Sequence, residues 1–121
     1  MITKFTISET AAEAEFGMAC QRLVPWTGAV EEPPFGAMAC FLPARSASSP
    51  DCHNQDEVMF VLSGQGEIDI AGERTGIAAG EVVAIPRNRE HVVHNPNDPM
   101  LVWVSCYWPL KEPPLPGEAR T

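Results

Sequence analysis

No apolar run in the sequence reaches the roughly 18 residues that a helix needs to cross a bilayer. Residues 1–10 also lack the charged start and the apolar stretch of a secretory signal. Basic residues are scarce, with 8 Lys and Arg against 16 Asp and Glu, and they are scattered rather than clustered. Nucleic acids and anionic lipid surfaces both attract clustered basic side chains. We therefore expect a cytoplasmic protein that binds neither nucleic acid nor membrane.

Closely spaced cysteine pairs are also missing. The four cysteines are far apart in the chain, at Cys20, Cys40, Cys52 and Cys106. This spacing excludes a zinc knuckle of the CxxC type, and without an export signal a disulfide framework is not expected either. We expect buried or idle thiols.

Proline and glycine, by contrast, are abundant, with 12 and 9 residues among 121. Proline at this density excludes long helices, and one segment alone, 9–16, has a composition that permits one or two helical turns. A tight turn at 71–73 predicts a hairpin within 67–77. Short segments rich in β-branched and apolar residues lie between the breaks, at 36–42, 57–62, 66–70, 80–85, 91–94 and 101–108. Such strands separated by turns predict a single all-β domain, built as a sandwich or barrel.

The three histidines, His53, His91 and His94, mark the segments where chemistry is expected. Alternate side chains of an extended strand share a face, so Asp51, His53 and Glu57 point the same way unless a turn breaks the alternation. An imidazole and two carboxylates are common ligands of a catalytic divalent metal. His91 opens a strand after a turn that begins at a proline, and it can meet this cluster across a barrel. His94 has the opposite alternation and is expected to point away.

Two segments of the chain resemble the two motifs of the cupin family. The first motif reads HxH, three or four residues, Glu, six residues and Gly, and its second His, its Glu and its Gly fall at His53, Glu57 and Gly64. The second motif reads Gly, five residues, Pro, x, Gly, two residues, His, three residues and Asn. Its first Gly, its Pro, its His and its Asn fall at Gly80, Pro86, His91 and Asn95.

The resemblance covers most of the chain and implies a jelly-roll barrel, also called a double-stranded β-helix. It implies a cupin barrel over 35–109, an N-terminal extension with an edge strand over 1–34, and a Pro-rich tail over 110–121. Cupins commonly pair through sheet edges, and the apolar segments 16–26 and 101–108 need cover. We therefore expect a homodimer.

The resemblance also implies one divalent metal ion, Fe, Mn, Zn or Ni, although the ligand set departs from the usual three histidines and one glutamate. Asp51 stands where the motif has its first His, so the available set is Asp51, His53, Glu57 and His91. Asp51 is either a fourth ligand or a neighbour that serves as a base or hydrogen-bond acceptor. In the second case two histidines and one carboxylate remain, as in non-haem Fe(II) sites that bind O₂. A barrel without metal is the third alternative.

The wall of the substrate pocket is expected to include Met59 and Val61, which share the alternation of Glu57. Arg45 lies just ahead of the first motif and is a candidate for pairing with a substrate carboxylate. Arg22 is a second candidate for this role. The alternative for each arginine is an ordinary surface charge.

Small single-domain cupins resemble enzymes of specialised metabolism, and the fold does not choose among oxygenases, lyases, isomerases and cyclases. We therefore expect a metal-dependent enzyme that acts on a small carboxylate- or amino-acid-like substrate in a biosynthetic pathway. The alternative is a non-catalytic cupin that binds or senses a small molecule, which Asp51 in place of a histidine favours. Retention of His53, Glu57 and His91 favours the enzyme.

Overall fold

Short strands joined by turns make up residues 1–114, the part of the chain that this computed structural model describes. Residues 115–121, the larger part of the expected Pro-rich tail, lie outside the described residues. Within residues 1–114, no helix has the length and the apolar character to cross a bilayer. In chain order the elements are η1 (Glu9–Ala11, a 3₁₀ turn), β1 (Glu13–Glu15), β2 (Met18–Val24), β3 (Gly36–Leu42), β4 (Ser46–Ala47), β5 (Asp56–Ser63), β6 (Gln65–Ile70), β7 (Glu73–Ala78), β8 (Val82–Ile85), β9 (His91–Asn95) and β10 (Leu101–Trp108).

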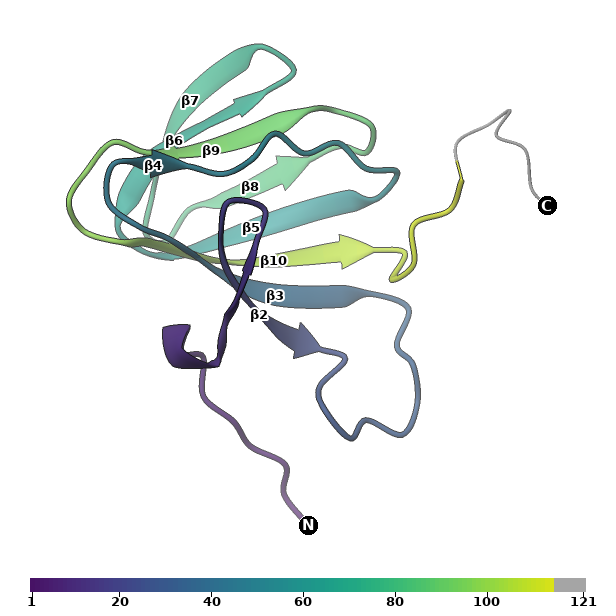
Figure 1. Cartoon of the computed structure of the whole chain (residues 1–121). Coiled ribbons are helices and arrows are strands. Elements are labelled where there is room, and N and C mark those ends of the chain that lie inside the picture. Colours follow the sequence, from purple (N-terminus) through teal and green to yellow (C-terminus); the bar gives the residue numbers. More distant parts are fainter. Residues whose placement is uncertain (115–121) are drawn as a thin grey trace.

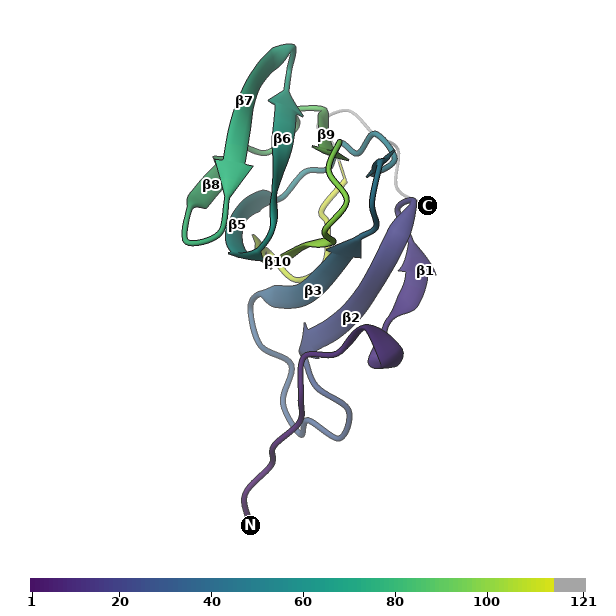
Figure 2. The same ribbon diagram turned by 90° about the vertical axis from the view of Figure 1, so that its left-hand side faces the viewer.

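The strands form two antiparallel sheets that face each other across the core (Figure 1, Figure 2). The larger sheet has the order β1-β2-β3-β10-β5-β8, and the smaller has the order β4-β9-β6-β7. The chain crosses between the two sheets repeatedly, so that β3 pairs with β10 although they are far apart in sequence. This arrangement confirms the predicted all-β class and the jelly-roll, or double-stranded β-helix, architecture.

The strand boundaries follow the pattern of the sequence closely. Two predicted strands, 36–42 and 101–108, coincide with β3 and β10, and the predicted hairpin is formed by β6 and β7. The other predicted strands end within two residues of the observed ones. Apolar and β-branched segments between Pro and Gly breaks therefore locate most strands of the barrel, whereas the two-residue strand β4 was not predicted.

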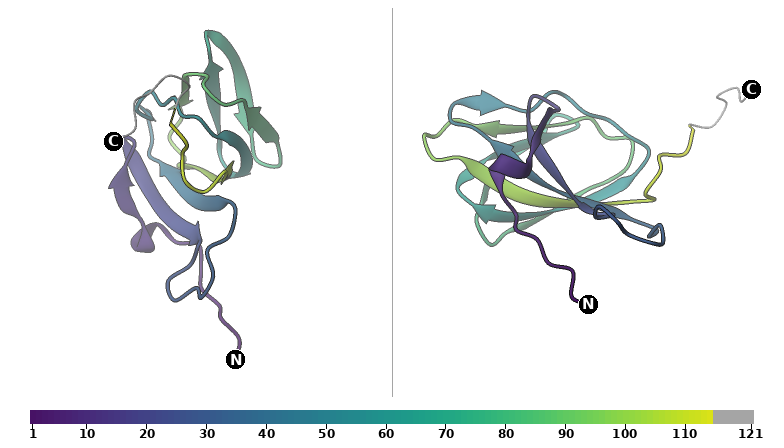
Figure 3. Two further views of the ribbon diagram at one scale, coloured as in Figure 1. Left: turned by 90° about the vertical axis from the view of Figure 1, so that its right-hand side faces the viewer. Right: turned by 60° about the horizontal axis from the view of Figure 1, so that its bottom comes forward.

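The N-terminal extension contributes two strands to the larger sheet, where a single edge strand was expected (Figure 3). Of the segment with helix-forming composition, only Glu9–Ala11 is helical, while Glu13–Glu15 is a strand that pairs with β2. Phe16 and Gly17 join these two strands with positive φ angles of 55° and 76°. Two consecutive residues with positive φ suit the tight turn of a hairpin, and this turn outweighs the helical composition.

The strands of the two segments expected to need cover from a partner chain are paired on both edges within this chain. β10, at 101–108, is hydrogen-bonded to β3 on one side and to β5 on the other. The segment 16–26 contains β2, which pairs with β1 and with β3. Exposed apolar side chains remain at Trp26 and Trp108, at the ends of these two segments, and at Phe60, Leu62 and Val82 on β5 and β8. The homodimer stays a prediction, without support from the edges of those two segments.

The core fills the space between the two sheets. Its buried side chains come from both sheets and are Cys20, Met38, Cys40, Leu42, Met59, Val61, Ile68, Ile77, Ile85, Val93, Leu101 and Trp103. All four cysteines are free thiols, and two of them belong to this core. Cys52 is exposed.

Truncating a core leucine is expected to destabilise the protein far more than truncating a leucine on the outer face of the sheet. Leu42 is completely buried on β3, whereas 49 % of Leu62 is exposed on β5. Leu42→Ala should lower the free energy of unfolding by about 2–5 kcal/mol through lost transfer energy and a residual cavity. Leu62→Ala should cost less than about 1 kcal/mol. Equilibrium urea denaturation of both variants checks this, and equal losses would contradict the placement of the core.

Candidate metal centre

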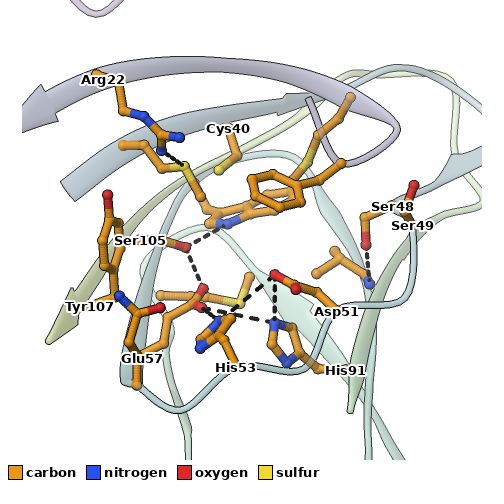
Figure 4. A pocket seen from close by; sticks show the side chains of 17 residues that line it. Arg22, Cys40, Ser48, Ser49, Asp51, His53, Glu57, His91, Ser105 and Tyr107 are labelled. Atoms are coloured by element: carbon orange, nitrogen blue, oxygen red, sulfur yellow. Dashed lines mark hydrogen bonds and ion pairs between the residues drawn. The ribbon is translucent and has the colours of Figure 1, made fainter. Parts of the chain in front are cut away.

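Four side chains converge inside the barrel, and they are the four that the sequence predicted as metal ligands (Figure 4). Asp51, His53 and His91 each offer one ligand atom, and these atoms all lie within 4.8 Å of one another. Glu57 Oε1 lies 3.0 Å from His53 Nε2 and 3.8 Å from His91 Nε2. Asp51 Oδ2 is 3.7 Å from the first of these nitrogens and 3.9 Å from the second.

Backbone pairing, and not a regular strand, brings Asp51 and His53 to the cluster. The segment 51–57 bends before β5 begins at Asp56, so the alternation argument used for it does not describe its backbone. Asp51 instead forms an isolated β-bridge with His91, in which each backbone N–H donates to the other residue's carbonyl, at 3.1 and 2.8 Å. The backbone N–H of Asn88 donates to the carbonyl of His53 at 2.8 Å. These contacts connect the two motifs directly.

Asn88 occupies the turn position where the second motif of the family has glycine. Its φ is 62°, in the left-handed region that favours glycine and that asparagine tolerates better than most residues. The turn before His91 therefore keeps its backbone conformation despite the change of residue.

The hydrogen bond at Nδ1 of His91 determines whether Nε2, the ring nitrogen that faces the cluster, carries a hydrogen or a lone pair. Nδ1 lies 3.0 Å from the backbone carbonyl of Arg89. A carbonyl can only accept, so Nδ1 carries the hydrogen, and in neutral imidazole Nε2 then carries a lone pair. This lone pair faces carboxylate oxygens of Asp51 and Glu57, which are acceptors as well. Acceptor groups that converge in this way fit a bound cation, so the residues present suit a divalent metal.

Glu57 is buried and nevertheless ionised. Burial opposes its charge, but hydrogen bonds from His53 and Ser105 outweigh burial and lower the pKa of Glu57. The hydrogen bond with Glu57 likewise raises the pKa of His53 against the effect of burial. Because its pKa is lowered, Glu57 is a carboxylate at neutral pH, the form that binds a cation. Among the described residues, His53 Nδ1 has no hydrogen-bond partner although it is buried.

Ser105 is a functional residue that the motifs did not point to. Its side chain is buried on β10, and its hydroxyl lies 2.7 Å from Glu57 Oε2 and 3.1 Å from Trp103 Nε1. Indole N–H can only donate, so the Ser105 hydroxyl accepts from Trp103 and donates its own hydrogen to Glu57. This bond holds one carboxylate oxygen and leaves Oε1 facing the histidines. The sequence did hold one indication of this role, because Ser105 lies two residues after Trp103 and therefore points to the same inner face of the strand.

Removing the Ser105 hydroxyl is expected to weaken metal binding without removing a ligand. Loss of a partner that orients a ligand typically costs about 10- to 100-fold in metal affinity, and Ser105→Ala should fall in this range. Cys106→Ala, one residue along and on the opposite face of β10, is the control and should bind as the parent does. Competition with a fluorescent chelator measures both. Unchanged affinity in Ser105→Ala would show that Glu57 does not need this bond.

A cavity of about 170 Å³ lies beside the four convergent side chains. Its wall is mainly apolar and contains Phe16, Met18, Met38, Met59, Val93 and Trp103, with polar groups from Arg22, Ser48, Ser49, Gln55 and Tyr107. A cavity of this size admits only a compact molecule. The cavity therefore joins a set of cation-binding groups to a small-molecule pocket.

Only some of the residues expected in the pocket wall line the cavity in the structure. Met59 lines the cavity, whereas Val61 is buried in the core and does not. Arg45 lies on the surface, where it pairs with Asp98, and does not line the cavity. Sequence proximity to the first motif was misleading for Arg45, because the chain turns away from the cavity there. Arg22, from the N-terminal extension, is the arginine that reaches the cavity.

A barrel of two antiparallel sheets with histidines and carboxylates gathered in its interior has the architecture of a cupin. The Cupin_2 family, a family of cupin domains, matches residues 37–107, which is more than half of the chain. The chain therefore belongs to this family.

The chain is also similar to individual proteins. The uncharacterised protein SCO3923 of Streptomyces coelicolor is 38 % identical over 63 residues, which is 52 % of this chain and 60 % of that protein, so the match spans less than two thirds of the relative. The plu4264 protein from Photorhabdus luminescens has a similar structure, with a TM-score of 0.79, 27 % identity, and coverage of 89 % of this chain and 88 % of that one. A Cupin 2 conserved barrel domain protein from Salinispora arenicola CNS-205 shares the fold, with a TM-score of 0.79, 24 % identity and 89 % coverage of both chains.

Proposed function

We propose that this protein is a metal-dependent enzyme that binds one divalent ion, Fe, Mn, Zn or Ni, and acts on a small carboxylate- or amino-acid-like molecule. His53, Glu57 and His91 hold the ion in this proposal, with Asp51 as fourth ligand or as the neighbouring base. The observation that carries the proposal is the geometry of His91, whose Nδ1 lies 3.0 Å from the Arg89 carbonyl while its Nε2 lies 3.9 Å from Asp51 Oδ2 and 3.8 Å from Glu57 Oε1 inside the barrel. Only a proton or a cation makes that arrangement favourable.

Each residue of the site has a separate task in this proposal. Ser105 and the Arg89 carbonyl orient Glu57 and His91 from outside the cluster. A divalent ion, when bound, supplies Lewis acidity and open positions for the oxygen donors of a small molecule. Asp51 has a side chain that is 30 % exposed and lies near both imidazoles. As a base it is placed to accept a proton from a molecule that enters the cavity.

The shape of the cavity supports a small substrate. The volume of about 170 Å³ excludes polymers, and the apolar wall excludes bulk water from much of the bound molecule. We expect an organic acid whose carboxylate or adjacent oxygen donors reach the ion directly.

Turnover by metal-loaded protein tests the proposal. The protein is stripped with chelator, reloaded separately with each of the four metals, and incubated with a panel of hydroxy acids, oxo acids and amino acids under air. Mass spectrometry should detect a product with at least one metal and none with the His91→Ala variant. His94→Ala, which changes the same residue type on the opposite face of β9, is the matched control and should retain turnover.

A second function is favoured by one feature, the aspartate at position 51 in place of a histidine. In this alternative the protein binds or senses a small molecule without converting it. Metal-dependent binding of an acid from the panel, measured by calorimetry and accompanied by no turnover with any metal, would favour this alternative over the enzyme.

A further inference from the structure

One cationic side chain reaches the same cavity from the N-terminal extension. Among the described residues that line the cavity, only Arg22 carries a permanent positive charge. It lies on β2, opposite Met38 of the neighbouring strand, and its guanidinium points toward the cavity (Figure 4). The four convergent side chains lie on a different part of the wall.

On the side that faces the cavity, the guanidinium of Arg22 has only a weak hydrogen-bond acceptor. Nη1 lies 2.8 Å from the thioether sulfur of Met38, which is a weak acceptor. Nη2 pairs with Glu15 at 2.6 Å, but these side chains are 48 % and 34 % exposed, so solvent screens the pair. An oxygen anion that replaced the sulfur would gain a charge-assisted hydrogen bond. Arg22 is therefore ready to bind an anion inside the cavity.

The adjacent wall leaves room for such an anion and offers a further donor. Tyr107 faces Gly36 across β10 and β3, and a Cβ at Gly36 would lie 2.5 Å from the Tyr107 hydroxyl. The missing side chain thus lets the Tyr107 ring lean over β3 toward β2, on the same side of the cavity as Arg22 (Figure 4). A guanidinium and a hydroxyl together form a suitable site for a carboxylate.

We propose that Arg22 anchors a second carboxylate of the substrate, so that the ligand is a compact dicarboxylate held at both ends. This inference rests on the proposed function, because the other end of the ligand is the one that reaches the metal. The apolar wall between the two sites, which includes Met38 and Trp103, then faces the short carbon chain of the ligand. The cavity of about 170 Å³ limits that chain to a few carbons.

The test compares pairs of 2-hydroxy acids that differ only at the far end. Zinc-loaded protein is titrated calorimetrically with malate against 2-hydroxybutyrate and with 2-hydroxyglutarate against 2-hydroxyvalerate. The better-fitting dicarboxylate should bind about 10- to 100-fold more tightly than its partner, as expected for hydrogen bonds to a charged group. Arg22→Met should remove this preference while keeping the zinc content and the affinity for the monocarboxylates. Arg45→Met, on the surface, should keep the preference.

A second variant distinguishes anchoring from a merely structural role of Arg22. Glu15→Gln removes the internal competitor for the guanidinium and should increase the preference for the dicarboxylate. A preference that survives in Arg22→Met, or an absence of preference in the parent protein, would overturn the inference and leave the proposed function standing. Zinc-loaded protein that binds none of the four acids would likewise overturn the inference, while the proposed function is tested separately by turnover with all four metals and the wider panel of acids.

Discussion

Replacing His91 with alanine is expected to lower the affinity for divalent metal by more than about 100-fold. Loss of a group that only orients a ligand costs about 10- to 100-fold, and His91→Ala removes the ligand atom itself. The Arg89 carbonyl fixes this ring so that Nε2 presents a lone pair to the cluster. His53→Ala should have a comparable effect, because its Nε2 lies within 3.0 Å of Glu57.

The measurement is chelator competition, combined with elemental analysis of protein dialysed against trace metal. His94→Ala is the control, since His94 lies on β9 with the opposite alternation and pairs across to β4 and β6. Circular dichroism of the metal-free variants checks that all of them fold. Metal content and affinity in His91→Ala equal to those of the parent protein would remove this histidine from the site.

Asp51→Ala is expected to reduce metal retention or turnover by about tenfold or more, while Cys52→Ala should change neither. Asp51 Oδ2 lies within 3.9 Å of both imidazole nitrogens, whereas Cys52 is exposed. The two possible roles of Asp51 give different results. A ligand lost should appear in the metal affinity, and a base lost should appear in turnover at full metal occupancy.

Asp51→Asn sharpens this comparison, because it preserves the size of the side chain and the backbone bridge to His91 while removing the charge. It should resemble Asp51→Ala in whichever quantity that variant changes. Equal losses in Asp51→Ala and Cys52→Ala, or a larger loss in Cys52→Ala, would mean that the thiol belongs to the site and would contradict the separation of Asp51 from Cys52.

Much of the barrel could be predicted because the strand ends and the turns are marked by residues close to them in the sequence. β3 and β10 are bounded by proline, glycine and polar residues, and the two spaced motifs mark the turns that carry His53 and His91. The strand β1 could not be found in this way. Its residues, Glu13–Glu15, have helix-forming composition, and it exists because the turn at Phe16 and Gly17 folds it back on β2.

Site residues that belong to a motif were predicted from the sequence. Site residues that reach the site only through a tertiary contact were missed. Ser105 belongs to no motif, and its role depends on the approach of β10 to β5, which brings it to Glu57. Arg22 and Arg45 could not be ranked from the sequence, because each lies outside the motifs. Pairing of β2 with β3 brings Arg22 to the cavity, while a turn with positive φ carries Arg45 to the surface.

Anomalous diffraction from crystals of zinc-loaded protein tests the central claim most directly. The account predicts one strong zinc peak per chain inside the barrel, about 2.0–2.2 Å from a nitrogen of His53, a nitrogen of His91 and an oxygen of Glu57. A distance to Asp51 in the same range would make it the fourth ligand. A barrel without a zinc peak at full zinc loading, or a peak held only by surface carboxylates or by Cys52, would contradict the account.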